Sequence, residues 1–246
     1  MRGIAIALLA VCATVPAAAQ QKDWSYEGKQ GPLNWAHLDP SWRACSEGKQ
    51  QSPIDIKGAR LSSDAKPIEF HYISSSMTLV NTGHTVEVQP KPGSYIIADG
   101  TRYDLVEFHF HHPGEEPVNG KLSDMSVQFV HKSADGKVAI IAVRLNETTI
   151  ANVLLAGLWE HLPKTAGATD KMTQFLNPGA LLPVDRGYWA YDGSLTAPPC
   201  TEGVRWFVMQ QMVDISRDQR RAFAALYKVN SRLLQDRHGR KIVASE

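Results

Sequence analysis

Short segments in which apolar and polar residues alternate make up much of the chain, and this period of two predicts β-strands. Such segments cover residues 68–73, 77–80, 85–89, 95–98, 106–111 and 125–131, with turn-forming residues such as Asn81-Thr82-Gly83 and Asp99-Gly100 between them. Residues 138–143 are continuously apolar, which is typical of a strand buried on both faces. Residues 187–194 and 204–212 are expected to add strands, so the pattern predicts a mainly β protein.

Helical periodicity is scarce. Residues 152–161 form one short candidate helix, and residues 216–227 form a better one with Ser216 as its N-cap. Residues 23–51 are rich in Trp, Gly and Pro and predict an irregular segment that packs through its rings, and residues 230–246 are expected to be mostly irregular. Because no linker or internal repeat interrupts the chain, we expect one β-rich domain over residues 20–246.

Charge and the N-terminus restrict the compartment and the class of partner. The chain has 26 basic and 25 acidic residues among 246, a balance that indicates neither nucleic-acid binding nor an electrostatic membrane anchor. Residues 1–19 have a basic start, an apolar run and a small-residue cleavage motif, which is typical of a signal peptide. The apolar run is too short for a membrane span, so we expect a periplasmic or secreted protein.

Three cysteines are present, and the first lies inside the predicted signal peptide. The mature chain keeps Cys45 and Cys200, and an even pair in an exported protein indicates one disulfide. For so long a loop, the chain-entropy model gives roughly 4–5 kcal/mol of stabilisation. A thiolate metal site is the alternative, and the missing C-x-x-C motif disfavours it.

The residues from Leu105 to His131 carry the candidate chemistry. His109 and His111 alternate with Phe108 and Phe110, so on a strand both imidazoles point to one face. Glu115 and Glu116 follow, and a second strand-like run begins at residue 125. A lone His-x-His pair is commonly ordinary strand sequence, but with carboxylates and a second strand beside it the pattern favours a metal site.

Several blocks of sequence together resemble the α-class carbonic anhydrases, in particular the secreted bacterial branch. They are CSEGKQQSPIDI (45–56), NTGHTV (81–86), FHFHHPGE (108–115), residues 130–132, YDGSLTAPPCTEGVRW (191–206) and residues 230–232, in the family's order. The resemblance implies a mostly antiparallel, twisted sheet of roughly ten strands with small peripheral helices. It also implies zinc-dependent, reversible hydration of carbon dioxide to bicarbonate and a proton.

The resemblance assigns roles to individual residues. His109 and His111 match the first two zinc ligands, and His84 matches the proton shuttle at the cleft mouth. Thr196 matches a gatekeeper whose hydroxyl donates to a carboxylate at Glu115. Cys45 and Cys200 match a disulfide of extracellular members, and Glu107 and Asn230 match positions behind the ligand imidazoles. The apolar wall for carbon dioxide is matched by Val130, Ile140, Leu195, Val204 and Trp206.

The third zinc ligand departs from the family. Alignment without gaps places Gln128 where the family has histidine, whereas spacing alone nominates His131. Strand parity favours Gln128, because Ser126, Gln128 and Val130 share one face and Val130 belongs to the cleft wall. Using His131 would require a one-residue register slip that turns the strand over. We therefore expect His131 to be a core histidine, and we expect structural roles for His112 and His71.

Further departures gather around the same ligand. Ser126 replaces a common glutamate, Glu116 replaces a usual histidine, Gly114 replaces serine, and Glu107 replaces glutamine. We expect Glu116 to accept a hydrogen bond from the Gln128 amide, which would aim the amide oxygen at the metal.

Two hypotheses of different class follow. The first is a working carbonic anhydrase that holds Zn²⁺ with His109, His111 and Gln128, since an amide oxygen is a weaker but legitimate zinc donor. The second is a catalytically silent relative that uses the fold to bind a partner. The retained gate, shuttle and wall residues favour the enzyme. The sequence leaves the oligomeric state open, a homodimer included.

Overall fold

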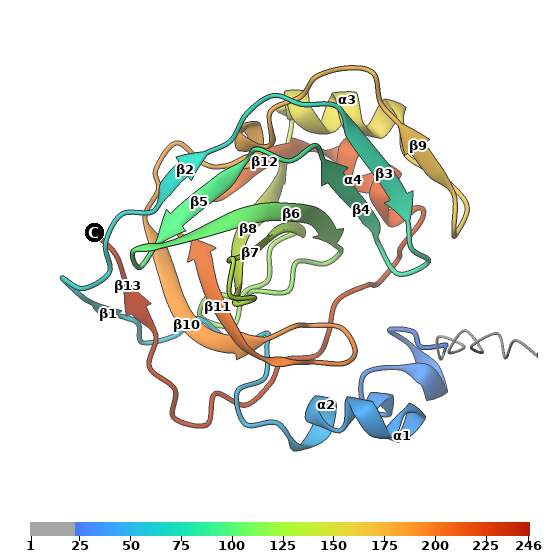
Figure 1. Ribbon diagram of the computed structural model, residues 1–246. Coiled ribbons are helices and arrows are strands. Elements are labelled where there is room, and N and C mark those ends of the chain that lie inside the picture. The colour runs from blue at the N-terminus through green and yellow to red at the C-terminus, as the bar shows by residue number, and fades with distance from the viewer. Residues whose placement is uncertain (1–22) are drawn as a thin grey trace, which may run out of the picture.

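The computed structural model describes residues 23–246, and one 13-stranded sheet dominates them (Figure 1). The predicted signal peptide lies outside the described residues. The strands are β1 (Arg60–Leu61), β2 (Glu69–His71), β3 (Met77–Asn81), β4 (Val86–Pro90), β5 (Tyr95–Ala98), β6 (Thr101–His111), β7 (Met125–Lys132), β8 (Val138–Thr148), β9 (Thr169–Lys171), β10 (Tyr188–Ser194), β11 (Glu202–Met209), β12 (Val213–Ser216) and β13 (Val243–Ala244).

The main strand order is β1-β13-β10-β11-β8-β7-β6-β4-β3-β9. Most neighbours are antiparallel, while β8 runs parallel to both β11 and β12, and β1 runs parallel to β13. The long strands β6, β7 and β8 therefore lie in the middle of the sheet, with partners on both edges. The predicted fold class is confirmed.

The two faces of these central strands have different surroundings. The large core cluster covers one face and contains Phe108, Phe110 and Phe129. A smaller cluster with Ile140, Ala142 and Trp206 lies on the other face. Residues 139–145 of β8 are all buried, so the prediction of a strand buried on both faces is confirmed.

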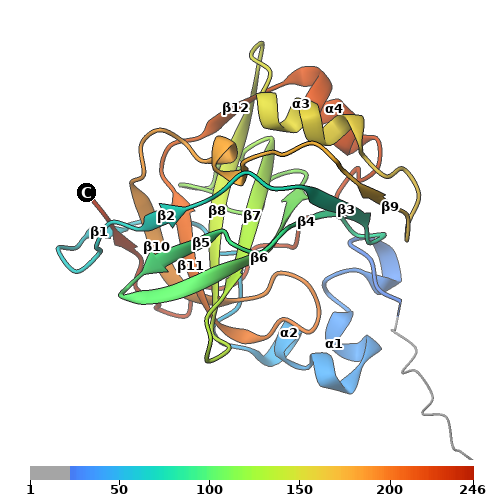
Figure 2. The same cartoon turned by 45° about the horizontal axis from the view of Figure 1, so that its top comes forward.

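The helices are short and peripheral: η1 (Gly28–Gln30), α1 (Trp35–Leu38), η2 (Pro40–Trp42), α2 (Ala44–Glu47), α3 (Val153–Glu160), η3 (Pro178–Leu181) and α4 (Arg217–Ala224). Figure 2 shows α3 and α4 together on one side of the sheet, while α1 and α2 lie at the opposite end. The predicted N-cap is confirmed, because Ser216 forms a capping box with Gln219. No helix in residues 23–246 has the length and apolar character that a membrane crossing requires.

Two details differ from the sequence expectations. The strand expected over residues 204–212 ends at Met209 and a separate strand, β12, begins at Val213, because Gln210 bonds across to Gly187 and the chain changes partner to β8. The N-terminal aromatic segment, expected to be irregular, forms the short helices η1, α1, η2 and α2.

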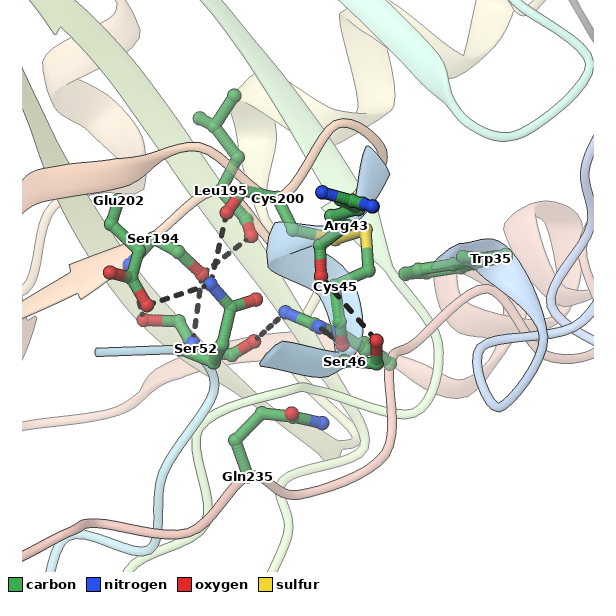
Figure 3. Close-up of a disulfide and its surroundings, with 12 residues drawn as sticks. Trp35, Arg43, Cys45, Ser46, Ser52, Ser194, Leu195, Cys200, Glu202 and Gln235 are labelled. Carbon is green, nitrogen blue, oxygen red and sulfur yellow. Dashed lines mark hydrogen bonds between the residues drawn. A yellow bond between two sulfur atoms is a disulfide. The ribbon is translucent and has the colours of Figure 1, made fainter. Parts of the chain in front are cut away.

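The predicted disulfide between Cys45 and Cys200 is confirmed, with an S–S distance of 2.07 Å (Figure 3). It joins α2 to the loop between β10 and β11, and the buried ring of Trp35 lies in the same apolar cluster. The Gln51 side-chain amide donates to the Cys200 carbonyl at 3.0 Å. The bond therefore ties the aromatic N-terminal segment to the loop that carries Leu195 and Thr196.

Replacing both cysteines with alanine should lower the free energy of unfolding by roughly 2–5 kcal/mol, because the bond closes a loop with a sequence separation of 155 residues. The measurement is urea unfolding of the oxidised protein and of the double variant. The reduced wild type should match the variant. Equal unfolding midpoints for the oxidised protein and the variant would contradict the prediction.

Candidate metal centre

The pairing of β6 with β7 creates the centre of the candidate site. In this antiparallel pair His109 lies directly opposite Gln128, and His111 lies opposite Ser126. Residues opposite each other share a face of the sheet, so both imidazoles and the Gln128 amide reach the same side. They line a cleft of about 610 Å³ together with Trp24, Tyr26, His84, Glu107, Val130, Ile140, Leu195 and Thr196.

Each imidazole is held by one ring nitrogen. His109 Nδ1 lies 3.0 Å from the carboxylate of Glu107, and His111 Nδ1 lies 2.7 Å from the backbone oxygen of Asn230. Because a carbonyl oxygen only accepts, Nδ1 of His111 carries the proton and Nε2 carries a lone pair. The expected positions of Glu107 and Asn230 behind the ligand rings are therefore present in the structure.

The Gln128 side chain is held by two buried carboxylates. Its Nε2 donates to Glu115 Oε2 at 2.9 Å and to Glu116 Oε1 at 2.7 Å. The predicted bond to Glu116 is thus present, and both amide hydrogens are used. A turned amide would place its oxygen against two carboxylates, so electrostatics fix this orientation. The amide oxygen is left for the side of the cleft where the imidazoles lie.

The arrangement leaves a buried acceptor without a donor. His111 is only 2 % exposed, and its Nε2 has no hydrogen-bond partner among residues 23–246. Burial lowers the pKa of His111, and the charge of Glu115, whose Oε2 lies 3.5 Å from Nε2, opposes this lowering only in part. Two acceptors that converge in a buried place are stabilised by a cation between them.

The donor set fits a zinc ion bound through two imidazole nitrogens and one amide oxygen. The part of the chain that the structure describes contains no group of three or more His, Cys, Asp or Glu side chains placed to hold a metal. A third donor must therefore be a side chain of another type. Gln128 is the candidate for this donor, because it lies opposite His109 and lines the same cleft.

Buried charge surrounds these donors. Burial lowers the pKa of His109, but the charge of Glu107 and the hydrogen bond to it outweigh burial and raise this pKa to about 9. A metal must therefore displace a proton from this ring. Burial, followed by repulsion from Glu115, raises the pKa of Glu116 to about 7. The backbone N–H of Arg232 donates to Glu115 Oε1 at 2.6 Å, which helps to hold this carboxylate.

His84 lies at the edge of the cleft and is fixed by Trp24. Its ring stacks on the indole with centroids 3.7 Å apart, and its Nε2 donates to the Trp24 carbonyl at 2.8 Å. The Asn230 amide donates to the backbone oxygens of His84 and Phe110. Asn230 therefore links the strand end that carries the ligands to the turn that carries His84.

The apolar wall is only partly as expected. Val130, Ile140 and Leu195 line the cleft. Val204 and Trp206, expected in the same wall, are not among the described residues that line the cleft, and both are buried in the apolar cluster that also contains Ile140. The Trp206 indole N–H donates to the Ser194 backbone oxygen at 3.0 Å, which holds the ring under the wall.

The expected hydrogen bond from Thr196 to Glu115 is absent from the described part of the chain. Thr196 lines the cleft, but the Glu115 carboxylate is engaged by the Arg232 backbone and by Gln128 instead. Gln128 donates to Glu115, where the match of Thr196 to the family's gatekeeper led us to expect the threonine hydroxyl as donor.

Sequence reasoning missed several residues that shape the site. Trp24, which stacks on His84, was recognised only as part of an aromatic segment. Arg144 and Arg232 are both buried, and burial lowers the pKa of each. The charge of Glu116 opposes this lowering at Arg144, and the charge of Glu115 opposes it at Arg232. A signal was present for Arg144, since it is a charged residue directly after the apolar run of β8.

His131, the ligand that spacing alone nominated, lies on the opposite face in the core. It is fully buried, with its Nδ1 donating to the Phe129 backbone oxygen at 3.0 Å. Its Nε2 accepts from the Tyr72 hydroxyl at 2.8 Å. The prediction of a satisfied core histidine is confirmed. His112 and His71 lie outside the cleft lining, His112 bonded to the Lys228 carbonyl and His71 stacked on Tyr95.

The sheet and the centre together define a β protein with two histidines and an amide converging in an apolar cleft. Comparison with known proteins agrees with this class. The family model for eukaryotic-type carbonic anhydrase matches residues 30–246, and the chain belongs to the carbonic anhydrase family. A carbonic anhydrase of Klebsiella pneumoniae is 38 % identical over 240 residues, covering 96 % of both chains.

Solved structures agree at the level of the whole domain. The α-carbonic anhydrase of Thermovibrio ammonificans, in complex with the inhibitor sulfanilamide, aligns with a TM-score of 0.88 and 36 % identity. This alignment covers 91 % of our chain and all of the other. Dioscorin complexed with ascorbate aligns with a TM-score of 0.85 and 29 % identity, covering 90 % and 97 % of the two chains.

The buried state of His131 predicts an acid-sensitive contribution to stability. Burial lowers the pKa of His131 from 6.5 to about 3. Below pH 6.5, therefore, this histidine binds a proton in the unfolded chain but stays neutral in the folded protein. This histidine therefore removes stability as the pH falls, by about 2 kcal/mol between pH 6.5 and pH 4.5. His131→Gln should abolish this component, so the stability gap between the wild type and the variant should narrow as the pH falls.

Urea unfolding at pH 7 and pH 4.5 measures this gap. His71→Gln, at an exposed ring stacked on Tyr95, is the control and should follow the wild type. A gap of constant size for His131→Gln would contradict the prediction.

Proposed function

We propose that this protein binds one Zn²⁺ through His109, His111 and Gln128 and catalyses the reversible hydration of carbon dioxide to bicarbonate and a proton. The observation that carries the proposal is the convergence of three donors on one cleft, with the buried Nε2 of His111 lacking a hydrogen-bond partner among the described residues and lying 3.5 Å from Glu115 Oε2. Membership of the carbonic anhydrase family supports the reaction.

When bound, zinc would supply Lewis-acid activation of water, the chemistry for which carbonic anhydrase is itself the general example. The chain's own residues hold and orient the side chains that would bind this zinc. Glu107 and the Asn230 carbonyl hold the two imidazoles, and Glu115 with Glu116 holds the amide.

The carbon dioxide side of the cleft is apolar. Val130, Ile140 and Leu195 form a surface against which an uncharged, apolar substrate can rest without losing hydrogen bonds. Thr196 provides a hydroxyl in the same cleft. Because Glu115 does not accept from it, this hydroxyl is free to donate to a substrate oxygen or accept from water.

His84 is suited to carry the released proton out of the cleft. With Nε2 donating to the Trp24 carbonyl, its Nδ1 has a lone pair to accept a proton. The stack on Trp24 keeps the ring at the cleft, so transfer through water does not require the ring to move far.

We also propose that the protein works outside the cytoplasm, in the periplasm or after secretion. A disulfide between Cys45 and Cys200 suits an oxidising compartment, and the first 19 residues of the sequence have the pattern of a signal peptide.

Zinc analysis of protein purified without added metal tests the proposal. Near-stoichiometric zinc, removable by a strong chelator, is the expected result. Gln128→His should then bind zinc more tightly, because imidazole is a stronger zinc donor than an amide oxygen. The expected gain is at least roughly 10–100-fold, which is the range produced by changing only a residue that hydrogen bonds to a metal ligand. Its carbon dioxide hydration rate, measured by stopped flow, should rise in parallel at limiting zinc.

Gln128→Ala is the matched control, since it removes the third donor and should weaken zinc binding below the wild type. A wild type that binds no zinc would reject the enzyme in favour of a binding protein. Equal zinc affinity in all three proteins would show that residue 128 does not contact the metal.

His84→Ala should lower turnover in weak buffer by about 10²-fold, the low end of what a positioned proton carrier contributes. Added imidazole buffer should restore most of the rate, and zinc affinity should not change. His71→Ala, at an exposed histidine, controls for removal of an imidazole. Loss of zinc from His84→Ala, or no rate change, would contradict the assigned role.

A further inference from the structure

Two buried, oppositely charged side chains beside the centre each have an atom without a hydrogen-bond partner among residues 23–246. One is Oε2 of Glu116, and the other is Nε of Arg144. Glu116 is 1 % exposed and Arg144 is 8 % exposed. Burying an ionised group without compensation is costly, so a buried acceptor and a buried donor in one region are best explained together.

The sheet places Arg144 next to the carboxylates. Arg144 on β8 lies directly opposite Ser126 on β7, so the two side chains share a face. That face also carries Gln128, two residues further along β7. Ser126 in turn accepts the backbone N–H of Glu115 at 3.3 Å and hydrogen bonds to Glu116, lowering its pKa.

The charges around Glu116 give Arg144 its role. Glu115 repels Glu116, while Ser126 and Gln128 provide only neutral hydrogen bonds. Tyr191, whose pKa is raised mainly by burial and further by Glu116, is neutral. Burial lowers the pKa of Arg144, and the charge of Glu116 opposes this lowering across a gap that no ion pair bridges among residues 23–246. Arg144 is therefore a cation that balances this carboxylate.

We propose that Arg144 is a positioning residue for the metal centre: its buried positive charge keeps the Glu116 carboxylate on the Gln128 amide and so keeps the amide oxygen directed at the metal. This inference rests on the proposed zinc site. In place of the family's glutamate at position 126, this chain combines a carboxylate at 116 with a guanidinium at 144.

The alternative is a purely architectural arginine. Arg144 Nη2 donates to the Gln210 backbone oxygen at 2.6 Å, and its guanidinium lies 5.4 Å from the centroid of the Trp189 ring. These contacts hold β8 near β10 and the end of β11 and would make Arg144 important for stability alone. The test must therefore measure the centre separately from folding.

The experiment measures zinc affinity by chelator competition for Arg144→Met and Arg144→Lys, each in the wild-type and in the Glu116→Gln background. Arg144→Met should weaken zinc binding roughly tenfold, the lower end of the range for residues that act on a metal through its ligands. Arg144→Lys should retain most of the zinc affinity. In the Glu116→Gln background, where no charge remains to balance, Arg144→Met should cause no further loss. Arg186→Met is the matched control, since its guanidinium also lies over an aromatic ring, that of Phe70.

A second readout uses the metal-free protein. The Gln128 side-chain NH₂, held by two carboxylates, should give ¹⁵N-NMR signals that exchange slowly with solvent, and Arg144→Met should shift them and speed their exchange. Arg186→Met should leave them unchanged. This readout remains available if the wild type binds no zinc, an outcome that would reject the zinc proposal alone.

Three results would overturn the role of Arg144. The first is unchanged zinc affinity in an Arg144→Met protein that is folded by circular dichroism. The second is an equal loss of affinity with and without the Glu116 charge, which is the result expected of an architectural residue. The third is an unchanged Gln128 amide signal in the metal-free variant.

Discussion

The candidate centre depends on one side chain, Gln128, being held between the carboxylates of Glu115 and Glu116. An amide has a donor end and an acceptor end, and either end could face the two histidines. Two carboxylates at 2.9 and 2.7 Å accept both amide hydrogens and so leave the oxygen for the cleft. Because β6 and β7 place His109 directly opposite Gln128, this local orientation decides whether a third metal donor exists at all.

The buried charges form a balanced set that differs from the pattern the family resemblance implied. The carboxylate expected on β7 is replaced by Ser126, and Glu116 supplies a carboxylate from the segment that follows β6. Two acids side by side repel each other, which contributes to the raised pKa of Glu116. The backbone N–H of Arg232 donates to Glu115. Burial lowers the pKa of the Arg232 and Arg144 guanidinium groups, and the charges of Glu115 and Glu116, respectively, oppose that lowering. Removing one member of such a set lowers the stability of the folded protein, because its partner then stays buried and unpaired.

Much of this arrangement could be predicted from the sequence, because it follows from strand periodicity. Alternation in β6 and β7, combined with the family alignment that put Val130 in the cleft wall, placed Gln128 beside His109 and His111 and placed His131 in the core. Contacts between segments distant in the sequence could not be predicted in the same way. The stack of Trp24 on His84, the exclusion of Val204 and Trp206 from the cleft lining and the loss of the Thr196–Glu115 bond depend on how separate segments pack. Periodicity carries no information about such packing.

The central claim is that Gln128 acts as a metal ligand through its amide oxygen. A crystal structure of the zinc-loaded protein, with anomalous scattering recorded at the zinc edge, tests this most directly. The account predicts a single peak within about 2.0–2.2 Å of one nitrogen each of His109 and His111 and of the Gln128 amide oxygen. A peak that contacts the two histidines while the Gln128 oxygen points away, or a peak at another place, would contradict it.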